Sequence, residues 1–164
     1  MNICLKTMTK ELARQYFRQF ELDPALFADP AQYAPYVYSQ DKADAVVERY
    51  RKLGRVYFAV MLGDEPIGEV VLKNIDRGER HCTLGISMRS DAYKNQGHGT
   101  RAEQLALQYA FDELGMTTVF ADSLIGNTRS RHVLEKVGFR EISRDETFVY
   151  YRCDKSSWNE CSYA

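Results

Sequence analysis

The stretch "YKNQGHGTRAEQLALQYAF", Tyr93 to Phe111, joins a glycine-flanked histidine to an amphipathic pattern. Apolar residues recur with helical spacing at Ala102, Leu105, Ala106, Tyr109 and Ala110. This spacing predicts a helix packed on a sheet, ended by Gly115. Glycines let the backbone turn sharply, and the first N–H groups of a helix carry partial positive charge. We therefore expect this loop to hold an anion, most naturally a phosphate or diphosphate.

Two nucleotide-binding motifs resemble this loop but fit it poorly. A mononucleotide P-loop needs G-x-x-x-x-G-K, whereas Gly97 and Gly99 are too close together and Lys94 precedes them. The dinucleotide pattern G-x-G-x-x-G/A is met by Gly97, Gly99 and Ala102, with Asp122 about 20 residues later. In that fold, however, the first glycine directly follows a buried parallel strand, and here a polar stretch intervenes. The loop therefore favours another type of phosphate site.

The remaining periodicity predicts the order strand, two helices, three antiparallel strands, helix, strand, helix and two strands. Besides the helix ended by Gly115, the expected segments are residues 2–8, 10–20, 41–53, 55–76 (a hairpin), 80–89, 116–124, 127–137 and 138–154. This order predicts an α+β domain with a mixed central sheet of about six to seven strands and helices on both faces.

Composition indicates an ordinary soluble protein. The 164 residues are 45% apolar and 27% charged, with a net charge of -1, which fits a single domain over residues 1–164. The balanced charge argues against nucleic acid or an anionic membrane as a partner. Apolar runs are shorter than the roughly 20 residues that cross a bilayer, and the N-terminus lacks a signal-peptide core. We therefore expect a cytoplasmic protein.

The cysteines suggest no metal site. Cys4, Cys82, Cys153 and Cys161 form no C-x-x-C pair. We expect reduced, buried thiols and no bound metal.

Two motifs together resemble a known family. The first is the glycine loop, and the second is "NTRSRHVLEKVGF", Asn127 to Phe139, which has the form N-x-x-S-x-x-V-L-E-K-x-G-F. With the elements between them, they resemble the GNAT superfamily of N-acetyltransferases, in the branch typified by ribosomal-protein N-terminal and spermidine acetyltransferases. The resemblance runs from about Arg55 to about Asp154. It implies the GNAT fold and transfer of an acetyl group from acetyl-CoA to a primary amine: a protein N-terminus, a polyamine or a small amine.

The resemblance also implies a set of cofactor-binding residues. The family loop Q/R-x-x-G-x-G/A begins here with Lys94 in place of glutamine or arginine, and its backbone N–H groups would bind the diphosphate of coenzyme A. An exposed strand edge would pair with the amides of pantetheine, and the second motif would line the thiol end. The residues are Lys94, Asn95, Gln96, Gly97, His98, Gly99 and Thr100 in the loop, Ile86, Ser87 and Met88 in the strand, and Asn127 and Ser130 in the second motif.

The catalytic base is less directly indicated. Many relatives carry a glutamate in an E-I-G strand pattern, but this chain has Thr83, Leu84 and Gly85. In the family, a backbone N–H of this strand polarises the thioester carbonyl. Glu69 is the candidate base, because strand alternation places it with Ile67 and Val71 on an apolar face, where burial would raise its pKa. The alternative is a surface glutamate on a half-exposed strand.

The catalytic acid stays open too. Many relatives have a tyrosine where this chain has Leu134. Ser130 could hydrogen-bond the thiol, or it could simply support the first turn of its helix. These departures leave a second hypothesis, a catalytically silent acyl-CoA-binding sensor or scaffold. Two interpretations also remain for Trp158 and the C-terminal stretch: packing at an edge, or a homodimer contact.

Overall fold

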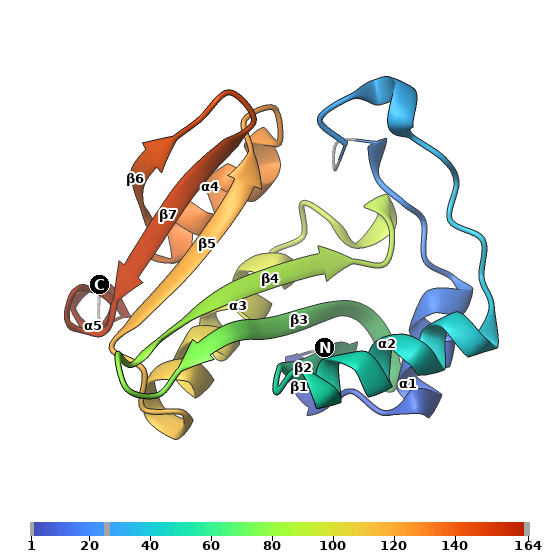
Figure 1. The fold of residues 1–164 in the computed structure, drawn as a ribbon, viewed down its shortest axis with the longest axis horizontal. Coiled ribbons are helices and arrows are strands. Elements are labelled where there is room, and N and C mark those ends of the chain that lie inside the picture. Colours follow the sequence, from blue (N-terminus) through green and yellow to red (C-terminus); the bar gives the residue numbers. More distant parts are fainter. Residues whose placement is uncertain (1, 25–26, 163–164) are drawn as a thin grey trace.

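The computed structural model describes residues 2–24 and 27–162, with side chains up to Trp158. Within these residues, seven strands form one sheet in the order β1-β2-β3-β4-β5-β7-β6 (Figure 1). The strands are β1 (Ile3–Thr7), β2 (Val56–Leu62), β3 (Glu65–Asp76), β4 (His81–Met88), β5 (Thr118–Leu124), β6 (Arg140–Arg144) and β7 (Phe148–Asp154). All neighbouring strands are antiparallel except β4 and β5, which are parallel.

Helices cover both faces of this sheet. They are α1 (Lys10–Arg18), α2 (Gln40–Lys52), α3 (His98–Gln108), α4 (Thr128–Val137) and α5 (Lys155–Ser162). The short turns are the 3-10 helices η2 (Pro30–Gln32) and η3 (Asp91–Tyr93) and the π-helical η4 (Tyr109–Glu113). The predicted mixed α+β architecture is confirmed. The C-terminal helix α5 was not expected from the sequence.

Two apolar clusters hold the layers together. On one side of the sheet, α1 and α2 contribute Tyr16, Phe17 and Ala43, which pack against Tyr57 and Ala59 of β2. The larger cluster on the other side combines α3 and α4 with the remaining inward-facing strand residues. The predicted N-cap of α4 is confirmed, because the Asn127 side chain accepts a hydrogen bond from the Ser130 N–H in the first turn of the helix.

One face assignment was wrong. Alternation along β3 predicted Ile67 and Glu69 on the same face, but Ile67 packs in the α3/α4 cluster while Val71 packs in the α1/α2 cluster. The cause is a β-bulge, because Val60 pairs with Gly68 and the next residue of β2 pairs with Pro66. Ile67 is the extra residue of this bulge, which breaks the alternation.

The helix after the glycine loop also differs in detail from its prediction. The buried residues of α3 are Ala102, Glu103, Ala106 and Leu107. The following turn is π-helical: Leu114 N–H donates to the Tyr109 carbonyl at 3.1 Å. The buried face is thus rotated from the predicted one, and it includes a glutamate.

The cysteines and the C-terminal stretch complete the fold. Cys82 and Cys153 are buried as expected, but Cys4 is exposed, which corrects that prediction; the Cys161 side chain lies outside the described residues. Trp158 packs against Phe111 with ring centroids 5.3 Å apart. In the part of the chain that the structure describes, no helix is long and apolar enough to span a membrane.

Candidate functional site

The two parallel strands separate in the middle of the sheet. β4 and β5 pair only from His81 with Thr118 to Thr83 with Phe120. Beyond these pairs the strands diverge, as Figure 1 shows. A cavity of about 780 Å³ occupies this gap, bounded by the ends of β4 and β5, the start of α3, the first turns of α4 and the segment after α1.

Most of the predicted cofactor-binding residues meet in this cavity. Its lining includes Ile86, Ser87, Met88, Lys94, Asn95, Gly97, Gly99, Thr100, Asn127 and Ser130. Two other members of the predicted loop, Gln96 and His98, are not among the lining residues. The Gln96 side chain instead donates a hydrogen bond to the Ala92 carbonyl within the loop.

Backbone directions along β4 follow from its pairing with β3. Arg89 N–H, just after β4, donates to the Ile67 carbonyl at 2.7 Å. Two residues earlier, Ser87 stands opposite Glu69. Because successive residues of a strand alternate direction, Arg89 and Ser87 turn their N–H and C=O groups toward β3.

The alternate residues of β4 face the gap. At the start of the strand, Thr118 N–H donates to the Arg80 carbonyl at 3.3 Å, so even-numbered residues point toward β5. Ile86 and Met88 share this direction, where β5 has already diverged. Their backbone groups therefore form an open strand edge that an extended ligand can pair with.

The glycine loop presents a helix entrance to the same cavity. Gly97 is the N-cap of α3, with φ of 80° in the left-handed region that favours glycine. Because glycine has no capping side chain, the first N–H groups of α3 remain available for an anion. Gly99 lines the cavity, and a Cβ built there would meet no atom within 4 Å beyond its own turn of helix. The backbone is thus open to close approach by a ligand.

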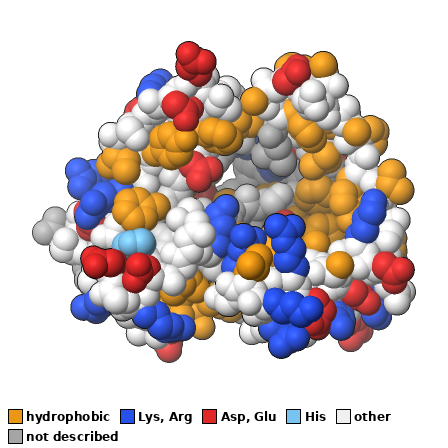
Figure 2. All heavy atoms as spheres, viewed as in Figure 1, with side chains coloured by type: hydrophobic (Ala, Val, Ile, Leu, Met, Phe, Trp, Pro, Cys, Tyr) orange, Lys and Arg blue, Asp and Glu red, His pale blue; other side chains and the backbone are white. Residues whose placement is uncertain are grey.

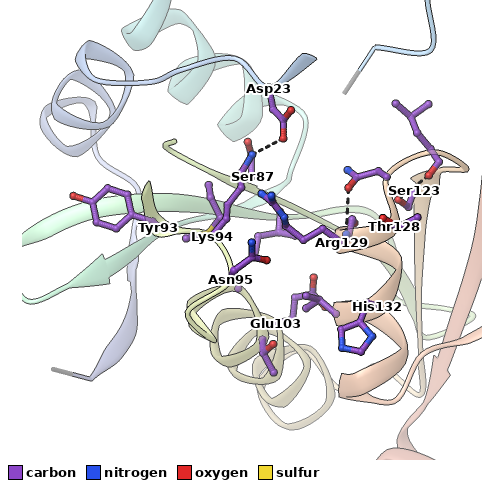
Figure 3. Close-up of a pocket in the computed structure, with 18 of the residues that line it drawn as sticks. Asp23, Ser87, Tyr93, Lys94, Asn95, Glu103, Ser123, Thr128, Arg129 and His132 are labelled. Carbon is purple, nitrogen blue, oxygen red and sulfur yellow. Dashed lines mark hydrogen bonds and ion pairs between the residues drawn. The ribbon is translucent and has the colours of Figure 1, made fainter. Parts of the chain in front are cut away.

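Basic residues border the cavity on the face drawn in Figure 2, where Lys and Arg side chains lie along one edge of a hollow. Lys94 Nζ is 2.5 Å from Asp23 Oδ2 and 3.0 Å from Asp91 Oδ1. Arg129 also contacts Asp91, at 3.4 Å. Figure 3 shows the Lys94–Asp23 ion pair crossing from the glycine loop to the segment after α1. This ion pair joins the glycine loop to the N-terminal third of the chain.

A buried arginine fixes the end of β4. Arg89 is 6% exposed, and its guanidinium lies 4.7 Å from the centroid of the Tyr93 ring. It also contacts Glu65 at 3.3 Å, and its carbonyl accepts a 2.7 Å hydrogen bond from Glu21 N–H. Arg89 therefore connects β3, the glycine loop and the segment after α1.

The candidate base Glu69 lies among tyrosines on the α1/α2 side, outside the cavity lining. It is half-buried, and the Tyr57 hydroxyl donates a hydrogen bond to its carboxylate. Desolvation raises the pKa of Glu69 to about 7, although the Tyr57 hydrogen bond acts to lower it. Glu69 stands directly across the ladder from Ser87, which does line the cavity. Glu69 is therefore one strand away from the cavity wall, a distance of about 5 Å between backbones.

The start of α4 forms the opposite wall. Asn127 Oδ1 accepts a hydrogen bond from Ser130 N–H at 3.2 Å, so Asn127 is the predicted N-cap. The Ser130 side chain lines the cavity near this turn. Leu134 is 2% exposed in the core and offers no acid, whereas His132 is exposed at the cavity rim.

A carboxyl group that sequence reasoning did not identify lies on α3. Glu103 lines the cavity, is 1% exposed, and its Oε2 has no hydrogen-bond partner among the described residues. Desolvation raises its pKa to about 8. The sequence could have indicated this residue, because Glu103 lies four positions before Leu107 and so on the same face of the helix as that apolar residue. By contrast, the contacts of Arg89 and Asp23 depend on tertiary structure and left no sequence signal.

Known proteins are similar to this chain in sequence and in fold. The sequence matches the acetyltransferase (GNAT) domain over residues 2–140. It is 28% identical over 120 residues to YdaF of Bacillus subtilis (strain 168), a protein provisionally described as a ribosomal N-acetyltransferase. That match covers 67% of this chain and 65% of YdaF. The chain therefore belongs to the GNAT acetyltransferase family.

Solved structures show the same architecture at low sequence identity. Spermidine N-acetyltransferase from Vibrio cholerae, in complex with CoA and spermine, aligns with a TM-score of 0.78 and 17% identity, covering 96% of this chain and 98% of that one. AAC(6')-Ib, with paromomycin and acetyl-CoA, gives 0.79 and 14%, with 97% of both chains covered. A GNAT-family acetyltransferase from Bacillus anthracis gives 0.74 and 19%, covering 95% and 96%.

Among the described residues, no group of three or more His, Cys, Asp or Glu side chains is placed to hold a metal ion.

Proposed function

We propose that the chain is a single GNAT domain over residues 1–164 that transfers an acetyl group from acetyl-CoA to a primary amine. The observation that carries this proposal is the gap between β4 and β5, which combines an open strand edge with a glycine-entered helix in one cavity. The strand edge suits an extended amide chain, and the helix entrance suits a diphosphate. Family membership supports the same activity.

The proposed binding mode assigns each part of coenzyme A to a wall of the cavity. The diphosphate lies on the N–H groups that begin α3, with Lys94 and Arg129 as nearby cations. The pantetheine arm follows Ile86, Ser87 and Met88, and the thioester reaches the turn that contains Asn127 and Ser130. Asn95 and Thr100 line the cavity beside the phosphates, whereas Gln96 and His98, outside its lining, contribute to the loop through its backbone.

The chemistry is direct attack within a ternary complex. The unprotonated amine attacks the thioester carbonyl, and a backbone N–H of β4 stabilises the developing oxyanion. Glu69 accepts the amine proton through water, for which a pKa of about 7 is well suited. The thiolate then leaves; because an ordinary thiol has a pKa of about 8.5, a hydrogen bond from Ser130 helps but is not essential.

The acceptor is a protein N-terminus, a polyamine or a small amine. Solved structures of the same fold hold spermine or paromomycin, so more than one amine shape fits this architecture. Release of the CoA thiol from acetyl-CoA, measured with N-terminal peptides, spermidine and aminoglycosides, tests the activity and identifies the acceptor. Acetyl-CoA binding without turnover for every amine would instead indicate a sensor or scaffold.

The assignment of Glu69 has its own test. Glu69→Gln should lower kcat/KM by about 100-fold and remove the acidic limb of the pH profile. Glu146→Gln, at an exposed loop position between β6 and β7, is the matched control and should change neither. A small, pH-independent loss in Glu69→Gln would show a structural role instead.

A further inference from the structure

Glu103 has no task in the reaction proposed above. Its side chain is 1% exposed and lines the cavity, and Oε2 has no hydrogen-bond partner in the described part of the chain. An unpartnered buried polar group costs about 1–3 kcal/mol, so native structures contain few of them. A carboxyl group in this state beside a ligand cavity therefore points to a partner on the ligand.

Its position shows which part of a ligand it would meet. Glu103 lies four residues after Gly99, about 6 Å further along the helix axis. It lines the same cavity as Ile86 of β4 and Val133 of α4. Figure 3 shows it on α3, below Asn95 and beside the helix that carries His132. Glu103 is thus past the helix entrance, on the floor of the gap beside the open strand edge.

The protonation state of Glu103 defines what it can bind. Burial is the cause that raises its pKa to about 8, so near neutral pH the group is mainly an uncharged acid. An uncharged carboxyl group has one O–H donor and keeps acceptor capacity. The other ionisable groups of the cavity are Glu21 and Asp23 after α1, Tyr93 and Lys94 in the loop, Asp122 on β5, and Arg129, His132 and Lys136 on α4.

This donor and acceptor pair suits one part of coenzyme A. The pantetheine arm is uncharged and carries amides and a hydroxyl, whereas the nucleotide half is anionic. We propose that Glu103, in its protonated form, hydrogen-bonds to the pantetheine arm of the acyl-CoA, so that cofactor binding is coupled to protonation of this side chain. The proposal rests on the acyl-CoA function proposed above.

The coupling has a definite sign. Ligand binding covers the cavity and removes remaining water from Glu103, which further disfavours a buried carboxylate. A carboxylate also has no O–H to donate. Acyl-CoA therefore binds more weakly to the deprotonated protein, and its affinity falls as the pH rises past the pKa of the free protein.

Calorimetric titration with acetyl-CoA between about pH 7 and about pH 9.5 tests the coupling. Acetyl-CoA has no thiol to titrate, and phosphate groups with a second pKa near 6 stay ionised across this range. The affinity of the native protein should fall by up to about tenfold per pH unit above about 8. Glu103→Gln keeps a neutral donor, so it should bind within about threefold of the native protein at neutral pH and show no such decline.

A second variant tests the proposal even if the glutamine side chain of Glu103→Gln packs poorly in the protein. Glu103→Leu fills a similar volume without a hydrogen bond, and it should bind about three- to tenfold more weakly at neutral pH, with a flat pH profile. Glu146→Gln is the exposed control and should follow the native profile. Parallel pH profiles for the native protein and Glu103→Gln, or undiminished binding by Glu103→Leu, would overturn the inference.

Adenosine 3′,5′-bisphosphate locates the contact on the ligand. It lacks the pantetheine arm, so neither Glu103 variant should alter its affinity; an equal effect on this probe would place the contact on the nucleotide and refute the proposal. The two proposals also fail differently. No acetyl-CoA binding at any pH would refute the acyl-CoA function itself, whereas tight but pH-independent binding to the native protein would refute only the role of Glu103.

Discussion

At the scale of single residues, the hydrogen bond between Tyr57 and Glu69 sets the pH range of the proposed base. The Tyr57 hydroxyl donates to the Glu69 carboxylate and acts to lower a pKa that burial raises to about 7. Tyr57→Phe removes this donor and should raise the pKa of Glu69, because the charged form loses a partner. The acidic limb of the kcat/KM profile should therefore move to higher pH by about one unit.

Tyr50→Phe provides the matched control. The Tyr50 ring packs against that of Tyr57, with centroids 4.8 Å apart, and removal of its hydroxyl should leave the acidic limb in place. A limb that stays fixed in Tyr57→Phe would mean that Glu69 is not the group that titrates.

Glu103 should also make stability depend on pH. Its pKa is raised from the ordinary 4.5 to about 8, so between these values the folded protein binds more protons than the unfolded chain. The slope of the free energy of unfolding against pH is then negative, and this contribution to stability is lost as the pH rises. Relative to the native protein, Glu103→Gln should gain stability by up to roughly 1.4 kcal/mol per pH unit across this window.

Urea denaturation at a series of pH values measures this difference. The comparison uses the slope, because an offset from packing of the amide is the same at every pH. Glu146→Gln, at an exposed site, should show no slope relative to the native protein. If the difference in free energy of unfolding between Glu103→Gln and the native protein does not change with pH, Glu103 is already ionised in the folded protein.

The sequence predicted these two carboxyl groups unequally. Glu69 was found because it interrupts an apolar strand, although a bulge moves Ile67, one of the two residues expected beside it, to the opposite face of the sheet. Glu103 was missed because it is adjacent to the predicted apolar stripe rather than on it. The spacing of apolar residues along the sequence indicates which residues are buried. The side chains that shift the pKa of a buried group come from other helices and strands, which this spacing does not identify.

At the scale of elements, α3 and its glycines should bind the ligand through backbone contacts. A Cβ built at Gly99 meets no atom within 4 Å beyond its own turn of helix, so Gly99→Ala should fold with a melting temperature no lower than that of the native protein. If a diphosphate approaches this backbone, the added methyl group should weaken acetyl-CoA binding by about tenfold, equivalent to about 1.4 kcal/mol. Calorimetry and thermal denaturation together measure the two effects.

Gly126→Ala is the matched control for Gly99→Ala. Gly126 also has open space at its Cβ position but is not part of the cavity lining, so its substitution should leave affinity unchanged. Gly97 is less suitable for this test, because its φ of 80° would strain any other residue even without ligand. Equal affinities for Gly99→Ala and the native protein would place the diphosphate elsewhere.

Elements were the part of the fold that the sequence predicted best. Strands rich in Val, Ile and Tyr, and helices with N-caps such as Asn127, are specified by local residues, and their order was correct. The bulge between β2 and β3, the π-helical turn Tyr109–Glu113 and the C-terminal helix α5 were not predicted, because the residue periodicity does not distinguish them.

At the scale of the whole molecule, the gap between β4 and β5 divides the sheet into two parts. Only three residue pairs, from His81–Thr118 to Thr83–Phe120, join β4 to β5 in the described chain. Residue periodicity alone does not predict this divergence, because a strand's length and polarity are the same whether or not its neighbour stays alongside; only the family resemblance implied an exposed strand edge here. A ligand that lies in the gap replaces the missing strand and connects the two parts.

This arrangement predicts an alternating pattern of hydrogen exchange. Ile86 and Met88 turn their N–H groups into the gap, while Ser87, between them, faces β3. Acetyl-CoA should slow exchange at Ile86 and Met88 by at least about tenfold, because each amide gains a partner that must open before exchange occurs. The Ser87 amide is already paired with β3, so its exchange rate should fall only as much as the ligand stabilises the whole protein. This global stabilisation depends on the ligand concentration relative to its dissociation constant and slows all amides that exchange by global unfolding equally.

Residue-resolved exchange measured by NMR, with and without acetyl-CoA, separates these contributions. Val70 on β3 serves as an internal reference for the global shift, since it lies in the ladder with β2 and β4 and away from the cavity lining. Slowing at Ile86 and Met88 in excess of this reference would mean that the ligand pairs with β4 as an added strand. Equal slowing at all four positions would show that acetyl-CoA stabilises the fold without pairing to that edge, and the binding mode proposed for pantetheine would then be wrong.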